Sequence, residues 1–413
     1  MKFRNLIIVL YLLQIGFSLF MKYLSYIGDD SPELHSLILK YFTEEDIQSG
    51  IEYSRRGFYA SILSQLIDFV FAGIFVFTSI SVKIENYLMN KTKNKFYASV
   101  VLFIIIYYGL EFIISLPFNY YFGFVLEHKF GFSKMTFLDW IVYTGKSLLV
   151  GAIIGIIIGL GAVYILKKFQ KTWKFIIPIA SFIFGMIFSV IFPILITPIF
   201  YDYRPISEGS LKDKIISLCK YSNISVENVY VIDESRYSGH TNAYFTGWGN
   251  NRKIFIYDTL IKNHTEDEVV SVLGHEIGHW IHNHELIGNA ASSAGLLILS
   301  FLLAFIFEKT KSEGLISLNE FYSPSSLPFI FLVSSIIFSF TNPFSSSISR
   351  MMEREADMEA LILTNDKKSF IDTEIKMAKD NKSRLNSHPW IVFYYHSHPT
   401  TLERIKMAED YKK

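Results

Sequence analysis

The chain alternates between long apolar runs and polar segments, and seven apolar runs are long enough to cross a bilayer. A membrane-spanning helix needs about 20 consecutive apolar residues. The seven predicted spans are Asn5–Met21, Gly57–Val82, Phe96–Leu126, Ser147–Leu166, Phe175–Tyr201, Leu286–Phe307 and Phe321–Ser349. No small-residue cleavage site follows the first span, so we expect a retained helix rather than a signal peptide.

The polar segments divide the chain into four parts. Residues 1–201 hold the first five spans and their loops, and residues 286–349 hold the last two. The two large polar pieces, 202–285 and 350–413, flank this last pair of spans. Two crossings return the chain to the same side of the membrane, so we expect both pieces to form one catalytic domain.

The first polar piece contains three short segments with strand character. Val229–Asp233 and Lys253–Tyr257 are rich in β-branched and aromatic residues, and Asn242–Phe245 lies between them. Gly247–Asn251 is a turn signal, which predicts a hairpin from the last two strands. We therefore expect a small sheet before the next helix.

That next helix carries the motif His275-Glu276-Ile277-Gly278-His279. Positions i and i+4 share one face of a helix, so His275 and His279 can bind one metal ion. Glu276 lies beside them, where a carboxylate can take a proton from a metal-bound water. Zinc suits this chemistry because it lowers the pKa of bound water to about 7. The alternative is a surface helix with two unrelated histidines, which the proline-free, periodic lead-in to the motif disfavours.

A catalytic zinc keeps three protein ligands and one open position, so a third ligand is expected on a second helix. Glu353 and Asp357 share a face at i and i+4, which allows Glu353 to bind metal while Asp357 orients a ligand histidine. Glu355 lies about 200° further round the helix, so we expect its loss to leave metal binding unchanged. This segment alone fits a charged, solvated helix end equally well.

Composition supports a membrane protein and excludes other classes. The chain is 51% hydrophobic, and its mean hydropathy of +0.30 is unusual for a soluble enzyme of 413 residues. A net charge of +1 argues against a nucleic-acid partner. Cys219 is the only cysteine, so neither an internal disulfide nor a cysteine-based zinc site can form.

Two predicted spans contain an acidic residue, Asp68 and Glu111. Ionisable residues inside spans usually face a bundle interior or a water-filled cavity. The pair therefore indicates a solvated chamber between the helices. The alternative is a span end displaced by a few residues, which is strongest for Glu111 because its span is longer than a bilayer needs.

Several separate stretches resemble the integral-membrane type I CaaX prenyl protease family, which is related to heat-shock-induced membrane zinc proteases. These stretches are residues 115–121, 127–134, 240–245, 258–260, 275–280 and 350–357, and His398-Pro399 with Arg404. The resemblance covers most of the chain from the third span onward. It implies seven transmembrane helices around a water-filled chamber, closed by a mixed α+β, zincin-like catalytic domain.

The resemblance also assigns roles to individual residues. It implies that His275, His279 and Glu353 bind one Zn²⁺ per chain, that Glu276 is the general base and that Asp357 orients a ligand. His398 resembles the histidine that stabilises the tetrahedral intermediate, a role that suits a donor aimed at a developing oxyanion. The residues that resemble the family's substrate-binding positions are Asn242, Ala243, Tyr244, Phe245 and Arg404. We expect the remaining histidines near the motif, His282, His284 and His396, to lie on the surface.

These observations favour a membrane zinc endopeptidase that cuts near the C-terminus of a peptide or protein, prenylated or otherwise membrane-associated. The alternative enzyme is a broad-specificity protease for membrane-protein quality control. A carrier or receptor with structural zinc is disfavoured, because such zinc usually has four protein ligands. An intramembrane-cleaving metalloprotease is also disfavoured, because its motif should lie inside an apolar span.

We expect a monomer in the bilayer of the bacterial inner membrane or the endoplasmic reticulum. Lysines and arginines near the span ends are equally numerous on both sides, so charge does not decide the orientation. The family resemblance implies that the active site faces the cytosol.

Overall fold

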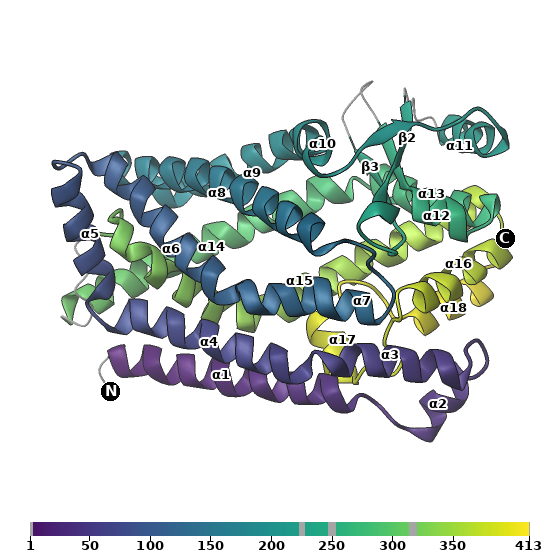
Figure 1. Ribbon diagram of the computed structural model, residues 1–413, viewed down its shortest axis with the longest axis horizontal. Coiled ribbons are helices and arrows are strands. Elements are labelled where there is room, and N and C mark those ends of the chain that lie inside the picture. Colours follow the sequence, from purple (N-terminus) through teal and green to yellow (C-terminus); the bar gives the residue numbers. More distant parts are fainter. Residues whose placement is uncertain (1–2, 223–227, 247–252, 314–319, 413) are drawn as a thin grey trace.

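The computed structural model describes residues 3–222, 228–246, 253–313 and 320–412. Its long helices run along the long axis of the molecule, and the strands and most short helices gather at one end (Figure 1). The N-terminus lies at the opposite end, whereas the C-terminus lies at the same end as the strands. Among the described residues, seven helical segments are long and apolar enough to cross a membrane. The prediction of a multi-pass helical membrane protein is confirmed.

The long helices occur where the apolar runs predict them. They are α1 (Phe3–Ile27), α4 (Phe58–Phe77), α6 (Phe96–Tyr120), α8 (Phe137–Lys168), α9 (Trp173–Ile191), α14 (His284–Ser312) and α15 (Leu327–Thr364). Two of them continue through π-helical turns, α6 into η1 (Tyr121–Leu126) and α9 into η2 (Phe192–Ile196) and α10 (Thr197–Phe200). Both turns lie close to prolines, which interrupt regular helix hydrogen bonding.

Shorter helices connect the spans. They are α2 (Pro32–Ile38), α3 (Glu44–Arg56), α5 (Ile80–Lys91), α7 (Glu127–Lys129) and η4 (Pro324–Ser326). The predicted second span, Gly57–Val82, is divided, because α4 ends at Phe77 and α5 begins at Ile80. The candidate span at this place instead extends backward through α3, from Glu44 to Phe77.

The last span differs from prediction at its C-terminal end. We expected it to end at Ser349, but α15 continues without a break to Thr364. The polar continuation stays helical because its inner face is apolar, with Ala356, Ala360 and Leu361 fully buried. One helix therefore links the membrane region to the region that contains Glu353.

A small mixed sheet lies at the end of the molecule away from the N-terminus. Within the described residues its order is β1-β2-β4-β3, with bounds β1 (Tyr203–Pro205), β2 (Asn228–Ile232), β3 (Ala243–Thr246) and β4 (Lys253–Tyr257). β2 and β4 are parallel, and β3 pairs antiparallel with β4. The three predicted strands are confirmed, and β3 is an edge strand. β1 was not predicted, and the turn Gly247–Asn251 lies outside the described residues.

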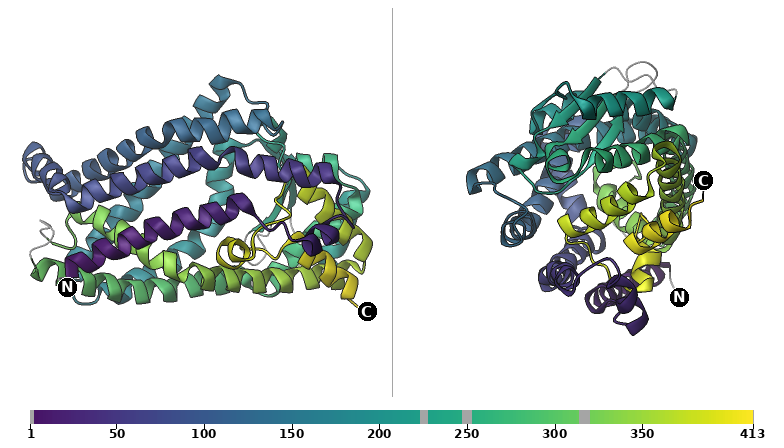
Figure 2. Two further views of the ribbon diagram at one scale, coloured as in Figure 1. Left: turned by 90° about the horizontal axis from the view of Figure 1, so that it is seen from below. Right: turned by 90° about the vertical axis from the view of Figure 1, so that its right-hand side faces the viewer.

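The two polar pieces of the chain pack together around one core. The first contributes α11 (Ser210–Tyr221), η3 (Glu234–Arg236), α12 (Asp258–Asn263) and α13 (Glu266–Ile281), and the second contributes α16 (Lys367–Asp380), α17 (Pro389–Tyr395) and α18 (Thr401–Asp410). Ile215, Ile254 and Leu273 are fully buried in this core, and Leu363 and Met377 pack against it from the second piece. Figure 2 shows the two pieces at the same end of the molecule.

Candidate metal centre and active site

The motif helix α13 has a well-defined start. The Thr265 hydroxyl accepts a hydrogen bond from the Glu268 amide, and the Glu268 carboxylate accepts one from the Thr265 amide, which is a capping box. Lys376 of α16 donates to both Glu268 oxygens at 2.8 Å. These contacts fix the direction of α13, which carries His275 two turns and His279 three turns after Glu268.

A close crossing of α13 and α15 brings the two halves of the site together. A Cβ atom added at Gly278 would lie 2.8 Å from the Ala356 Cα atom and 2.9 Å from its carbonyl oxygen. One turn earlier, a Cβ atom at Gly274 would lie 3.3 Å from the Ala360 Cα atom. Two glycines therefore face two alanines, and the helix backbones touch. Glu353, one turn before the nearest contact, reaches the histidines of α13.

The three predicted ligands converge. The His275 Nε2 and His279 Nε2 atoms are 3.1 Å apart. The Glu353 Oε2 atom lies 3.2 Å from His275 Nε2, and Glu353 Oε1 lies 3.5 Å from His279 Nε2. One ligand atom from each residue can be chosen so that all lie within 4.8 Å of one another. Such spacing matches tetrahedral coordination with bonds of about 2.0–2.2 Å.

The hydrogen-bond partners of the two rings favour tautomers in which both Nε2 atoms can bind a cation. His275 Nδ1 lies 2.7 Å from Asp357 Oδ1, so its proton goes to that carboxylate. His279 Nδ1 lies 2.8 Å from His284 Nδ1, and His284 Nε2 lies 3.0 Å from Glu355 Oε2. Both Nε2 atoms therefore carry lone pairs toward the Glu353 carboxylate. His275 Nε2, His279 Nε2 and the Glu353 carboxylate are then three hydrogen-bond acceptors that lie together with no donor proton among them. Such a group suits a divalent metal ion.

His284 differs from its prediction. We expected a surface histidine, but only 5% of His284 is exposed, and it links ligand His279 to Glu355. Glu355 points away from the ligand cluster, as its helix position predicts, yet it contacts the site through His284. The signal for this role in the sequence is weak, because a histidine five residues after His279 reaches back only if the chain reverses. Asn283 makes that reversal with a left-handed backbone (φ 53°).

Asp357, the partner of His275, contacts the charged group of Arg404, which in turn contacts Glu374. Arg404 Nε donates to Asp357 Oδ2 at 2.8 Å, and Arg404 Nη1 lies 2.7 Å from Glu374 Oε2. Burial raises the pKa of Glu374 to about 7, although the charge of Arg404 opposes this. The Arg404 guanidinium, predicted to bind substrate, is thus engaged with two buried carboxylates. Glu374 was not singled out from the sequence, because it lies in an ordinary helical pattern.

Glu276 and His398 flank the ligand cluster. Glu276 follows His275 on α13, and burial raises the pKa of its carboxyl, while the charges of His275 and His279 oppose this. A higher pKa makes a carboxylate a better proton acceptor near neutral pH. His398 approaches from the loop before α18, with Nε2 3.3 Å from Glu353 Oε2, and 58% of its side chain is exposed. The charges of both side chains therefore interact with the cluster.

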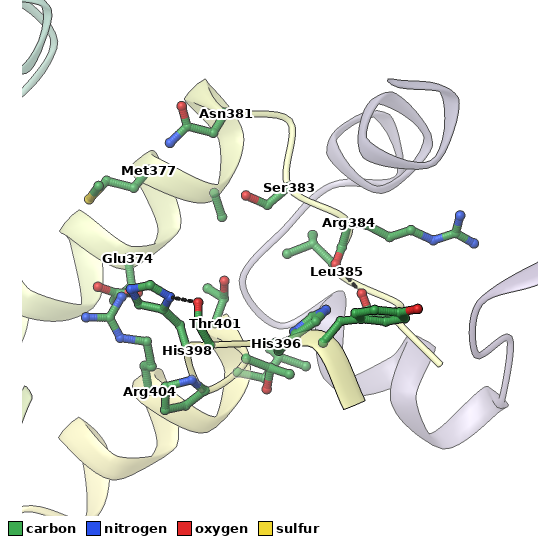
Figure 3. A pocket seen from close by; sticks show the side chains of 17 residues that line it. Glu374, Met377, Asn381, Ser383, Arg384, Leu385, His396, His398, Thr401 and Arg404 are labelled. Atoms are coloured by element: carbon green, nitrogen blue, oxygen red, sulfur yellow. Dashed lines mark hydrogen bonds and ion pairs between the residues drawn. The ribbon is translucent and has the colours of Figure 1, made fainter. Parts of the chain in front are cut away.

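A cavity of about 610 Å³ opens beside His398. Figure 3 shows His398, Arg404 and Glu374 gathered at one end of this cavity, with Arg384 at the other. Its walls come from α16, from the loop that follows α16 and from residues 395–402. The Asn381 Oδ1 atom in this wall accepts a hydrogen bond from His240 Nδ1 at 2.7 Å, which connects the cavity to the approach to β3.

The predicted substrate strand has a free edge. Tyr257 N–H donates to Asn242 C=O at 3.0 Å, and backbone partners alternate along antiparallel strands. The backbone groups of Tyr244 therefore face β4, whereas those of Ala243 and Phe245 face away. The Ala243 N–H lies 2.8 Å from the side-chain oxygen of Asn242, its own neighbour. β3 also packs against α13, so the strand lies beside the motif helix.

The fold and the ligand cluster together define a membrane-spanning metallopeptidase. Residues 205–412 match the model of peptidase family M48, and residues 30–202 match that of the CAAX prenyl protease N-terminal region with five membrane helices. The chain therefore belongs to peptidase family M48 and, within it, to the CAAX prenyl protease family. The prediction made from the sequence is confirmed at the level of family and enzyme class.

Individual relatives agree with this assignment. The chain is 36% identical over 313 residues to Probable CAAX prenyl protease 1 of Schizosaccharomyces pombe, which covers 72% of this chain and 63% of that protein. It is 33% identical over 322 residues to CAAX prenyl protease 1 of Saccharomyces cerevisiae, which covers 73% of this chain and 70% of that protein. The crystal structure of Ste24p from S. mikatae matches all of both chains, with a TM-score of 0.87 and 27% identity.

The close helix crossing makes a stability prediction. Gly278→Ala forces α13 away from the Ala356 backbone, so we expect it to lower the free energy of unfolding by about 1–3 kcal/mol and to reduce the amount of bound metal. Gly274→Ala, with its longer contacts, should have a smaller effect. The control is Gly288→Ala in α14, where an added Cβ atom meets nothing within 4 Å. Thermal unfolding and elemental analysis of the three purified variants measure this, and equal behaviour of Gly278→Ala and Gly288→Ala would contradict it.

Proposed function

We propose that this protein is a zinc endopeptidase that hydrolyses a peptide bond near the C-terminus of membrane-associated, prenylated CaaX-type peptides. The observation that carries the proposal is the convergence of three lone-pair donors from α13 and α15 beside Glu276. His275, His279 and Glu353 would hold one zinc ion per chain. Bound zinc would supply a polarised carbonyl and a more acidic water.

The remaining chemistry falls to the side chains around the ligands. Glu276 accepts the proton of the attacking water and then passes it to the leaving amine, as a general base and then a general acid. His398 lies where it can donate a hydrogen bond to the oxygen on which negative charge develops. Asp357 keeps the His275 ring in the orientation and tautomer that point Nε2 at the ligand cluster. Arg404, between Asp357 and Glu374, acts as a positioning residue rather than as a direct contact with substrate.

We further propose that substrate docks as an added strand on β3. The N–H and C=O groups of Ala243 and Phe245 face away from β4 and are the backbone partners that an extended peptide needs, and the Asn242 side chain, which accepts from the Ala243 N–H, would give way to the peptide. Asn242 and Tyr244 form the rest of this docking strand. The cavity beside His398 leaves room for residues of the bound peptide next to the ligand cluster.

The substrate class rests on the relatives, whose names describe CAAX prenyl proteases. Seven spans favour a lipid-attached substrate, because its anchor would then lie in the same bilayer as the membrane helices of the enzyme. We propose a monomer in the inner membrane or the endoplasmic reticulum, with the catalytic end in the cytosol. A broad quality-control protease would instead cut unmodified peptides equally well.

The central test compares one CaaX peptide with and without its prenyl group. We expect wild-type protein to cleave the prenylated peptide faster and to lose activity with a chelator. Glu276→Gln should keep zinc but lose hydrolysis, because an amide cannot accept the water's proton. Near-normal turnover by this variant, with its zinc content confirmed, would overturn the mechanism. Equal cleavage of both peptides would favour the quality-control function.

Metal content separates ligands from their partners. Glu353→Ala should purify largely without zinc, whereas Asp357→Ala should keep some, because loss of an outer partner typically costs about 10–100-fold in affinity or activity. Glu355→Ala should now also bind zinc more weakly than wild type, because its contact with His284 orients His279. Elemental analysis and zinc titration measure this order. Stoichiometric zinc in Glu353→Ala would show that the ligand assignment is wrong.

The docking strand makes a kinetic prediction. Ala243→Pro removes an outward N–H, so KM should rise sharply while bound zinc stays in place. Ala243→Gly keeps that N–H and is the matched control, with KM close to wild type. Peptide cleavage kinetics and zinc content of both variants provide the measurement. An unchanged KM in the proline variant would exclude β3 as the docking edge.

A further inference from the structure

A second cavity lies between the membrane-spanning helices, away from the ligand cluster. Its volume is about 690 Å³, and it is lined by residues of α1, α4, α6, α15 and α17. Asp68 of α4 and Glu111 of α6 line it together, close enough for their charges to interact. The two acids that the sequence places inside spans therefore face one shared space, which agrees with the expectation of a solvated chamber.

Two amide side chains that line the cavity have carbonyl oxygens without a hydrogen-bond partner in the described part of the chain. Gln14 is only 6% exposed, and its amide group donates to Ser339 at 2.9 Å and to Ser335 at 3.3 Å. Its carbonyl oxygen is buried and has no hydrogen-bond partner among the described residues. Gln65 lines the same cavity, and its side-chain carbonyl oxygen is also buried without a hydrogen-bond partner among the described residues. An unused buried acceptor is costly unless a donor meets it.

The other described residues that line the cavity supply no positively charged hydrogen-bond donor. Among the described residues that line this cavity there is no lysine, arginine or histidine. Its other walls are largely aromatic, and they include Tyr11, Tyr107 and Phe71. Carboxylates, amide oxygens and aromatic rings together suit an ammonium or guanidinium group, because rings attract such cations through their faces. A metal ion would gain little from the rings.

This cavity adjoins the cavity beside His398. Tyr395, at the end of α17, lines both cavities. His396, Ser397 and His398 follow it directly and line the cavity beside the ligand cluster. The two spaces therefore share a wall at the end of α17, and a peptide that reached from the ligand cluster to Asp68 and Glu111 would pass this wall.

We propose that Asp68, Glu111 and the carbonyl oxygens of Gln14 and Gln65 form a subsite for a lysine or arginine side chain of the substrate, at a distance from the cleaved bond. This inference rests on the proposed function, because it concerns a substrate held at the zinc site. It adds a preference for substrates with a basic residue outside the cleaved C-terminal segment.

The test uses full-length protein and a series of peptides that share one cleaved bond. A neutral parent peptide receives a single lysine, moved one position at a time away from that bond, and a matched series carries norleucine, which has a similar length and no charge. We expect one narrow range of positions at which lysine lowers KM about tenfold relative to norleucine. Cleavage of the neutral parent by wild type tests the proposed function separately.

Variants then locate the effect. In Asp68→Asn, Glu111→Gln and the double variant, the ratio of norleucine KM to lysine KM should fall toward one. Glu33→Gln, which removes an exposed acid on α2, is the control and should keep the wild-type ratio. If the double variant does not fold, each single variant should still lower the ratio. The proposal is overturned if no lysine position is preferred, or if the preference persists in both single variants.

Discussion

The close contact between α13 and α15 is the constraint on which the active site depends. Each helix carries part of the ligand set, so neither forms a site alone. Gly278 and Gly274 allow the backbones to touch at Ala356 and Ala360. Any larger side chain at Gly278 would separate the helices and move Glu353 away from the histidines. The glycine inside the H-E-x-x-H motif therefore has a packing role that the chemistry of the motif alone does not explain.

The same crossing determines how protons are distributed around the ligands. Asp357, one turn beyond Glu353, accepts a hydrogen bond from His275, and buried Arg404, which also contacts Glu374, balances the charge of Asp357. His279 reaches solvent-side Glu355 through His284. His275 therefore contacts a buried network of charged residues, whereas His279 contacts Glu355, which is partly exposed, through His284. This difference leads us to expect that changes near Asp357 affect the site more than changes near Glu355.

Much of this arrangement could be predicted from the sequence, because it depends on helical periodicity. The motif histidines and the pair Glu353 and Asp357 each lie one turn apart, and the apolar runs reveal the spans. His284 and Glu374 could not be found in the same way. His284 reaches His279 only through the reversed backbone at Asn283, and Glu374 depends on how α16 packs against α18. Both depend on tertiary contacts that leave no local pattern.

The helix α15 also explains why the membrane region and the catalytic end act as one unit. Beyond carrying Glu353, it holds the carbonyl groups at the end of α17, where Arg350 donates to Val392 and His396, and Ser346 and Asn342 donate to Tyr394. These bonds satisfy helix-end carbonyls that would otherwise lack partners. His398 follows this anchored segment by two residues. A single helix therefore positions the candidate ligand Glu353, the wall between the two cavities and the histidine beside the candidate ligand cluster, so a shift of α15 would alter all three together.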